Sequence, residues 1–177
     1  MKRNILLASA AAIVLALTAC GPNHDKEVAQ IKALEDSIYS SNKLVLDTTM
    51  GNNLVALYTQ FANDFPDDPA TPGYLFNAAD ISSNMCHYNE SIELLNRIIN
   101  NYDTVNNLGD CYFSLALAYE GNNDYEKAYE TYKLFVELFP EHPIASDTKI
   151  MLDNNLIGLS PDEMLNRIIN QNDSTTI

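Results

Sequence analysis

Apolar residues recur at helical spacing through the second half of the chain. Between residues 125 and 139 they follow the pattern i, i+3, i+4, i+7, i+10, i+11 and i+14, which places them on one helix face. The residues of this stripe are Tyr125, Ala128, Tyr129, Tyr132, Phe135, Val136 and Phe139. A second stripe lies one repeat earlier and contains Ile92, Leu95, Ile99 and Tyr102. Strand-like alternation is absent, so the pattern predicts an all-α protein.

The helical pattern repeats with a period of 37 residues. Three predicted helices end just before Pro66, Asp103 and Pro140, and these three residues are each 37 positions apart. The same shift aligns three large apolar residues, which are Phe76, Phe113 and Ile150. Periods of about 20–50 residues indicate solenoids, in which successive units bury one another's apolar faces. We therefore predict a short α-solenoid of antiparallel helix pairs, about three repeats long, over residues 50–170.

Both ends of the chain depart from the repeat. Residues 26–49 are interpreted as an N-terminal helix and loop, and residues 53–64 as the next helix. Residues 145–157 are interpreted as the first helix of a third pair. Ser160 and Pro161 then form a good helix start. The segment 165–170 repeats 95–100 letter for letter, which predicts a truncated helix that caps the open end of the stack. The polar tail, 171–177, is predicted to be disordered.

Seven residues of the central period form a series of large, small and aromatic positions: Tyr112, Leu115, Ala116, Tyr119, Ala128, Tyr132 and Pro140. A looser copy of the series one period earlier includes Ala79. The series resembles the tetratricopeptide repeat, a pair of antiparallel helices A and B. This resemblance implies that all eight residues pack the repeat, with small residues where helices A and B cross closely.

The resemblance also implies that helix A of each repeat lines a concave groove in which a partner binds. Carried onto this sequence, the candidate groove contacts are Phe76, Asp80, Asn84, Asp110, Phe113, Leu117, Glu120, Asp147, Ile150 and Asn154. The set combines an apolar strip with acids, which suits a segment with apolar anchors and Lys or Arg. Two interpretations of Phe76, Phe113 and Ile150 stay open, because they can also pack inside the repeat.

The first nineteen residues have the pattern of a signal peptide. A basic start is followed by an apolar stretch from residue 5 to 17, which is too short for a permanent membrane span. It ends in Leu17, Thr18, Ala19 and Cys20, which resembles the lipobox of bacterial lipoproteins. The resemblance implies cleavage before Cys20, acylation of its sulfur, and a lipid-anchored tether over 20–25. Since Gly21 follows the cysteine, the outer membrane is favoured, with the periplasmic face preferred over the cell surface.

The charge of the chain excludes some classes of partner. The chain has 10 basic and 24 acidic residues, and removal of Lys2 and Arg3 with the signal peptide leaves 8 − 24 = −16. A nucleic-acid binder needs a basic patch, and no basic cluster is present. The lipid anchor must therefore supply any attachment to the membrane, and the acidity is consistent with solubility or with a basic partner.

Motifs of catalysis and cofactor binding are absent from the sequence, which predicts a protein that is not an enzyme and binds no cofactor or metal. The three histidines, His24, His87 and His142, are expected in a tether and in two different turns. Cys86 and Cys111 are expected near opposite ends of parallel helices, roughly 18 Å apart at 1.5 Å per residue. This spacing predicts two free, largely buried thiols instead of a disulfide.

These features together predict a non-catalytic, membrane-tethered scaffold that binds other proteins of the bacterial cell envelope. Two alternatives share the architecture of a lipid anchor with a short repeat stack. One is a component of outer-membrane β-barrel assembly, and the other is an accessory subunit that recruits an envelope enzyme. The sequence does not indicate the oligomeric state.

Overall fold

The computed structural model describes residues 21–40 and 47–174, and within these ranges it consists of helices and connecting turns without a strand. The signal peptide and Cys20 lie outside the described residues, as do 41–46 and 175–177. The helices are α1 (His24–Ser40), α2 (Thr48–Asp64), α3 (Thr71–Asn84), α4 (Tyr88–Asn101), α5 (Leu108–Gly121), α6 (Tyr125–Leu138), α7 (Ala145–Asp153) and α8 (Pro161–Ser174). The all-α fold class is therefore confirmed.

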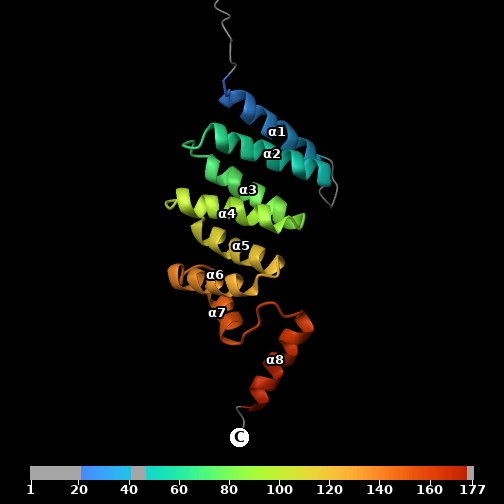
Figure 1. Ribbon diagram of the computed structural model, residues 1–177, viewed down its shortest axis with the longest axis vertical. Helices are drawn as coiled ribbons and strands as arrows, with labels where there is room; N and C mark the ends of the chain where they lie inside the picture. Colours follow the sequence, from blue (N-terminus) through green and yellow to red (C-terminus); the bar gives the residue numbers. More distant parts are fainter. Residues whose placement is uncertain (1–20, 41–46, 175–177) are drawn as a thin grey trace, which may run out of the picture.

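The helices form a single stack in which chain neighbours pack on one another from α1 to α7 (Figure 1). Helices α3, α5 and α7 begin at Thr71, Leu108 and Ala145, so each start is 37 residues after the previous one. Helices α4 and α6 begin at Tyr88 and Tyr125, with the same spacing. The predicted α-solenoid and its register are confirmed.

The repeat consists of helix pairs whose first helices are α3, α5 and α7. A residue with a left-handed φ follows the end of each of these three helices. Cys86, Asn123 and Asn155 have φ values of 62°, 62° and 51°. The next amide then bonds back into the helix, as in the 2.9 Å bond from Asp124 N to the Tyr119 carbonyl. Gly121 does not take this role. A Cβ at Gly121 would overlap the Tyr88 ring, so this glycine permits close packing of α5 on α4.

The turn between successive pairs is also built the same way three times. Each begins with an aromatic residue just after the helix, namely Phe65, Tyr102 and Phe139. The carbonyl oxygen of this residue accepts from the amide three positions on, at 3.1, 3.4 and 3.0 Å. Tyr102 also donates from its hydroxyl to the Pro66 carbonyl of the preceding turn, at 2.8 Å. Because these turns are equivalent, successive pairs are added in the same orientation.

Buried apolar side chains run through the whole stack. One cluster extends from Ile31 of α1 to Ala118 of α5, and a second joins α5, α6 and α7 around Tyr132. The small residues Ala79, Ala116 and Ala128 are part of this core, since they are at most 1% exposed. Arg97 links two pairs, because its guanidinium donates to the Ala62 carbonyl at 2.6 Å and to Asn63 Oδ1 at 2.7 Å.

Helices α3 and α5 also lie close together, although they belong to different pairs. In the described part of the chain, the second helices α2, α4 and α6 show no such approach to one another. The stack is therefore tighter on the side of α3 and α5, and this side is called its inner face.

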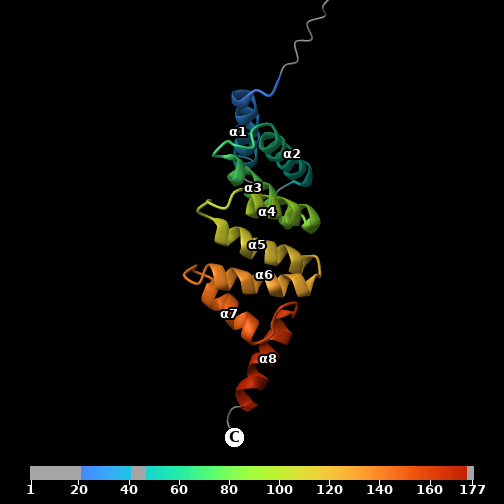
Figure 2. The same cartoon turned by 60° about the vertical axis from the view of Figure 1, so that its left-hand side comes forward.

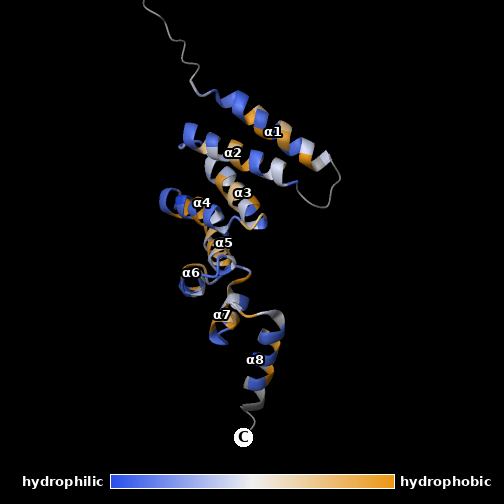
Figure 3. Cartoon of the chain, turned by 45° about the vertical axis from the view of Figure 1, so that its right-hand side comes forward, coloured by the Kyte–Doolittle hydropathy of each residue, from blue (hydrophilic) through white to orange (hydrophobic). Residues whose placement is uncertain are grey.

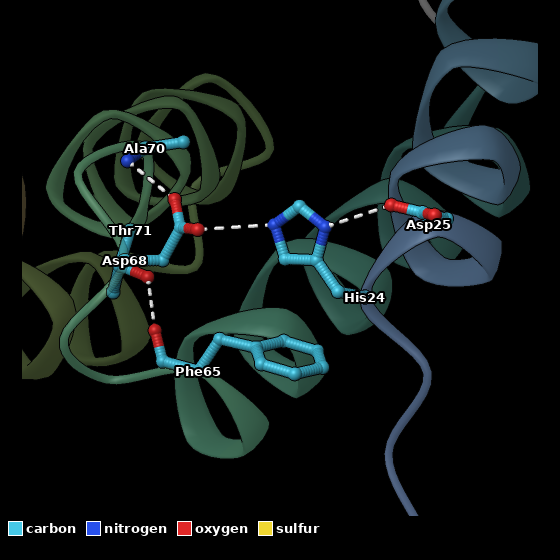
Figure 4. A network of polar contacts seen from close by, with 6 residues as sticks. All are labelled: His24, Asp25, Phe65, Asp68, Ala70 and Thr71. Carbon is cyan, nitrogen blue, oxygen red and sulfur yellow. Dashed lines mark hydrogen bonds and ion pairs between the residues drawn. The ribbon is translucent and has the colours of Figure 1, made fainter.

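The start of α1 is fixed to the turn between α2 and α3 by His24 (Figure 4). Its Nε2 lies 3.0 Å from Asp68 Oδ2 and its Nδ1 lies 3.2 Å from Asp25 Oδ1. The ring also packs against Phe61 and Phe65, with centroids 5.4 and 5.2 Å away. His24 is thus the first residue of α1, which corrects the prediction that residues 20–25 form a tether as a whole. The helix starts earlier than the apolar stripe indicated, because these contacts extend it.

The first helix of the third pair, α7, is shorter than predicted. α7 ends at Asp153, whereas 145–157 was the predicted range, because Asn155 is left-handed and the Leu156 amide bonds to the Met151 carbonyl at 3.0 Å. α2 differs in the other direction and begins at Thr48, since Asp47 caps it by accepting from the Thr49 and Met50 amides. Residues 171–174 belong to α8, so the predicted disordered tail is wrong for these four residues, where no Gly or Pro interrupts the helix.

The last helix forms where the sequence predicts it, but it does not cover the end of the stack. Ser160 and Glu163 cap α8 reciprocally, with Ser160 N donating to Glu163 Oε2 at 2.9 Å. α8 packs against none of the other described helices and extends past α7 (Figures 1 and 2). The predicted capping contact is therefore not made, because the early end of α7 redirects the chain.

The docking of α1 is expected to weaken as the pH rises. Hydrogen bonds to Asp25 and Asp68 raise the pKa of His24 above its ordinary value of 6.5. Their stabilisation is therefore complete below pH 6.5 and is lost as the pH rises through the raised pKa. Glu27 adds to this trend, because burial and the neighbouring Asp64 raise its pKa above 4.5, so that its ionisation opposes docking.

Hydrogen exchange of the α1 amides at pH 5.5 and pH 8, corrected for intrinsic rates, tests this expectation. Protection should be higher at pH 5.5, and His24→Ala should reduce the difference. His87→Ala is the matched control, since His87 lies in the turn between α3 and α4. Equal corrected protection at both pH values would contradict the role given to His24.

Candidate protein-binding surface

A pocket of about 150 Å³ opens on the inner face of the stack between α3, α4 and α5. Four predicted groove residues line it: Phe76, Asp80, Asn84 and Leu117. Its remaining lining consists of Ala79, Ser83, Ser91, Leu95 and Ser114. The pocket has the size of a single side chain and combines an apolar floor with hydroxyl, amide and carboxylate groups at its edge.

Helix geometry explains why these residues meet. Phe76, Asp80 and Asn84 are four residues apart on α3, so they lie on one face of that helix. Leu117 comes from α5, which lies beside α3 on the inner side of the stack. Asn84 donates from Nδ2 to Asp80 Oδ2 at 3.2 Å, which orients the carboxylate at the edge of the pocket.

The pocket carries an acidic group without a basic one. Asp80 is the only charged side chain among the described residues that line it. Its carboxylate is exposed and accepts a hydrogen bond from a neutral amide. A cationic group that enters the pocket would therefore meet a carboxylate that is not neutralised within the lining.

Three predicted groove residues on α5 make contacts within the fold. Asp110 lies 3.2 Å from His142 Nε2, so it joins α5 to the turn before α7. Phe113 is half-buried, with its ring centroid 5.5 Å from those of both Tyr132 and Phe135. Glu120 accepts a hydrogen bond from the Tyr132 hydroxyl at 3.0 Å and from the Gly158 amide at 2.8 Å. These three side chains support the repeat, and they do not line the pocket.

The three predicted groove residues on and after α7 also lie outside the pocket. Asp147 and Ile150 are exposed, and Ile150 retains 52% of its surface. Asn154 donates from Nδ2 to the Ile150 carbonyl at 2.8 Å, so it caps the end of α7. The ten predicted residues thus separate into a pocket group, a supporting group on α5, and a group at the C-terminal end.

Ser83 and Ser114 complete the edge of the pocket but were not among the predicted residues. Ser83 follows Asp80 by three positions, and Ser114 precedes Leu117 by three, so helical spacing was the available signal. A more open hollow of about 500 Å³ lies on the other side, between α2 and α4, and contains Asp64 and Glu90. Its edges are polar and its openness makes it the weaker candidate for binding a single segment.

Both cysteines in the described residues are free thiols, but only one is buried. Burial raises the pKa of the Cys111 thiol to about 12. Cys86 is exposed, which corrects the prediction that both are largely buried. The physical reason is its left-handed position after α3, equivalent to Asn123 after α5, which places it in a turn instead of a packed face.

Within the described ranges, no group of three or more His, Cys, Asp or Glu side chains is arranged to hold a metal ion. The helices of the same ranges include none with the length and apolar character needed to cross a membrane.

The tetratricopeptide repeat family matches residues 109–142. These residues form a tetratricopeptide repeat. They comprise nearly all of α5, α6 and the turn that follows, which is the segment that carries the seven-residue series from Tyr112 to Pro140. No curated protein matches the chain.

Tetratricopeptide repeats generally bind other proteins and are typically non-catalytic, and no enzymatic family is indicated for this chain. Within the matched repeat, Ala116, Ala128 and Tyr132 are fully buried, while Tyr112 and Tyr119 are half-buried. Pro140 is exposed and follows the end of α6. The repeat therefore implies a role in protein–protein interaction.

Replacing Phe113 should destabilise the fold, because its ring packs against Tyr132 and Phe135. Phe113→Ala is expected to lower the free energy of unfolding by about 2–3 kcal/mol, measured by urea denaturation. Leu117→Ala is the matched control on the same helix, and since Leu117 is 45% exposed, a change of less than about 0.5 kcal/mol is expected. Equal effects of the two substitutions would show that Phe113 is not part of the core.

Proposed function

We propose that this protein is a lipid-anchored, non-catalytic scaffold of the bacterial cell envelope. Its repeat stack would bind a segment of another envelope protein that carries apolar and basic residues. The observation that carries this proposal is the pocket on α3, α4 and α5, which combines Phe76 and Leu117 with the Asp80 carboxylate. The tetratricopeptide repeat at 109–142 supplies the general role in protein binding.

The shape of the pocket favours one inserted side chain from a longer segment. An opening of about 150 Å³ accommodates a Lys or Arg side chain, whose stem can lie against Phe76, Leu95 and Leu117. The charged head would then lie at the edge, where Asp80, Ser83 and Asn84 supply oxygen atoms. A Glu or Asp side chain would be repelled by Asp80.

The overall charge supports the same class of partner. The mature chain would carry 8 basic and 24 acidic side chains, 8 − 24 = −16, once Lys2 and Arg3 are removed. Such a field attracts basic segments and repels anionic lipid headgroups. A covalent lipid anchor would hold the stack at the membrane despite this repulsion.

The N-terminal sequence supports the anchor and its place. Leu17, Thr18, Ala19 and Cys20 end a short apolar stretch, and Gly21 follows the cysteine, which favours the outer membrane. α1 begins at His24, four residues after Cys20. Because the His24 contacts with Asp68 fix the start of α1, the anchored end of the stack would lie close to the membrane.

Binding by the pocket can be tested with labelled peptides in which one Lys or Arg is flanked by apolar residues. A matched set carries Glu in place of the basic residue. The chain should select the basic set, and Asp80→Asn should weaken binding by about two- to fivefold, as expected for one exposed ion pair. Fluorescence anisotropy at two salt concentrations measures this change.

Asp147→Asn is the matched control, because Asp147 is an exposed acid on α7 that does not line the pocket. It should leave the affinity for the basic peptides unchanged. Equal affinity for the basic and acidic sets, or an equal loss in both variants, would contradict the proposed pocket.

The anchor can be tested through incorporation of a labelled fatty acid in the bacterial cell. Cys20→Ala should abolish the label on the chain, and intact mass spectrometry should no longer find acylated protein beginning at residue 20. Cys86→Asn is the control, since it removes an exposed thiol without touching the lipobox. Labelling that persists in Cys20→Ala would exclude Cys20 as the acylated residue.

A further inference from the structure

The last helix presents an apolar face that no other described helix covers. Leu165 and Ile169 of α8 retain 58% and 49% of their surface. They are four residues apart, so they lie on one face, about 6 Å apart along the axis. In Figure 3, orange segments alternate with blue ones along α8. Natural helices of this kind usually bury such a face against a neighbour.

A six-residue sequence of α8 also occurs in α4, where its packing can be seen. Residues 95–100 of α4 are identical in sequence to residues 165–170 of α8. In α4 this segment packs against the first helix of its pair, and Leu95 is only 1% exposed. Leu95 lies with Phe76 of α3 around the same pocket. The six residues in α8 thus have a sequence that, in α4, belongs to the second helix of a pair.

The position that such a helix would fill is open on α7. Ile150 of α7 is 37 residues after Phe113 and 74 after Phe76. Phe113 packs against Tyr132 and Phe135 of the following helix, whereas Ile150 is 52% exposed. α7 has nine residues and is about 13 Å long, which suffices for two helical turns such as those of Leu165 and Ile169.

The connecting segment 154–160 directs α8 away from the α7 of its own chain. Leu156 is buried at 4% exposure, and Gly158 donates its amide to Glu120 Oε1 at 2.8 Å. A Cβ at Gly158 would lie 2.7 Å from the Tyr125 ring, so the backbone rests directly on that ring. These contacts fix the connection on α5 and α6, and α8 leaves beyond the end of the stack (Figure 2).

We infer that α8 packs on α7 of a second copy of this chain, with Leu165 and Ile169 of one copy against Ile150 of the other. The exchange is reciprocal, since each copy offers one exposed α8 face and one open α7 face. A two-fold arrangement of this kind closes and leaves no further copy to bind. The dimer is independent of the inner-face pocket and of the lipid anchor.

A disulfide between two differently tagged copies tests this contact in cells that express the full chain. One copy carries Ile150→Cys and the other Leu165→Cys, both with Cys86→Asn to remove the exposed native thiol. Asn suits this position, because Asn123 has the same left-handed φ of 62°. Mild oxidation should give a product with both tags, since a disulfide forms when the Cα atoms are within about 7 Å.

Arg167→Cys in place of Leu165→Cys is the matched control, because residue 167 lies on the opposite side of α8 from Leu165 and Ile169. It should give at most a small fraction of the cross-linked product. The proposal is overturned if the two-tag product is absent while both new thiols react with a maleimide. It is equally overturned if a chain that carries both substitutions forms only an internal disulfide.

The mass of the purified full chain in mild detergent provides a second measurement. The mass of the wild-type protein should correspond to two chains. Leu165→Asp with Ile169→Asp should raise the dissociation constant of the dimer at least about tenfold. The melting temperature of the diluted, monomeric protein should not change, because α8 packs on no helix of its own chain. A lower melting temperature of that monomer would show instead that α8 packs within one copy.

Discussion

Each helix pair of this stack has two apolar sides, and the interface between successive pairs is the contact on which the rest of the structure depends. α2 packs on α3, α4 on α5 and α6 on α7, through turns that have the same hydrogen bonds each time. Because the interface repeats every 37 residues, equivalent positions of α3, α5 and α7 appear in a row on the inner face. The function then depends on which neighbours cover each member of that row. Phe76 borders a pocket, Phe113 is covered by α6, and Ile150 is uncovered.

The repeat and its register were predictable from the sequence, since they rest on local helical spacing and on an exact repeat of 37. The C-terminal end was not predictable in this way, because α7 is five residues shorter than the equivalent helix α5. Asn154 and Asn155 repeat the Asn122 and Asn123 that end α5, and this pair was the signal for the early stop. The burial of Cys86 was misjudged for the same reason, since it takes the left-handed place that Asn123 takes one repeat later.

The binding surface was predictable in part. Phe76, Asp80 and Asn84 share one face of α3, so spacing alone places them together. Spacing within one helix does not reveal contacts from other segments. Glu120 accepts hydrogen bonds from Tyr132 of α6 and from Gly158 of the last connection, and Asp110 contacts His142 of the turn before α7. Both acids are therefore engaged within the fold, which leaves Asp80 as the charged group of the pocket.

The two ends of the stack meet the same physical problem in different ways, because a terminal repeat has no further unit to bury its apolar side. At the N-terminal end, the 17-residue helix α1 packs on α2, and His24 and Ile31 attach it to the fold. At the C-terminal end, α7 has nine residues and Ile150 stays uncovered. The chain nevertheless carries in α8 a copy of the α4 segment that covers Phe76. The connection held by Glu120 keeps α8 from the α7 of its own chain, so the open end is complementary to a helix of another copy.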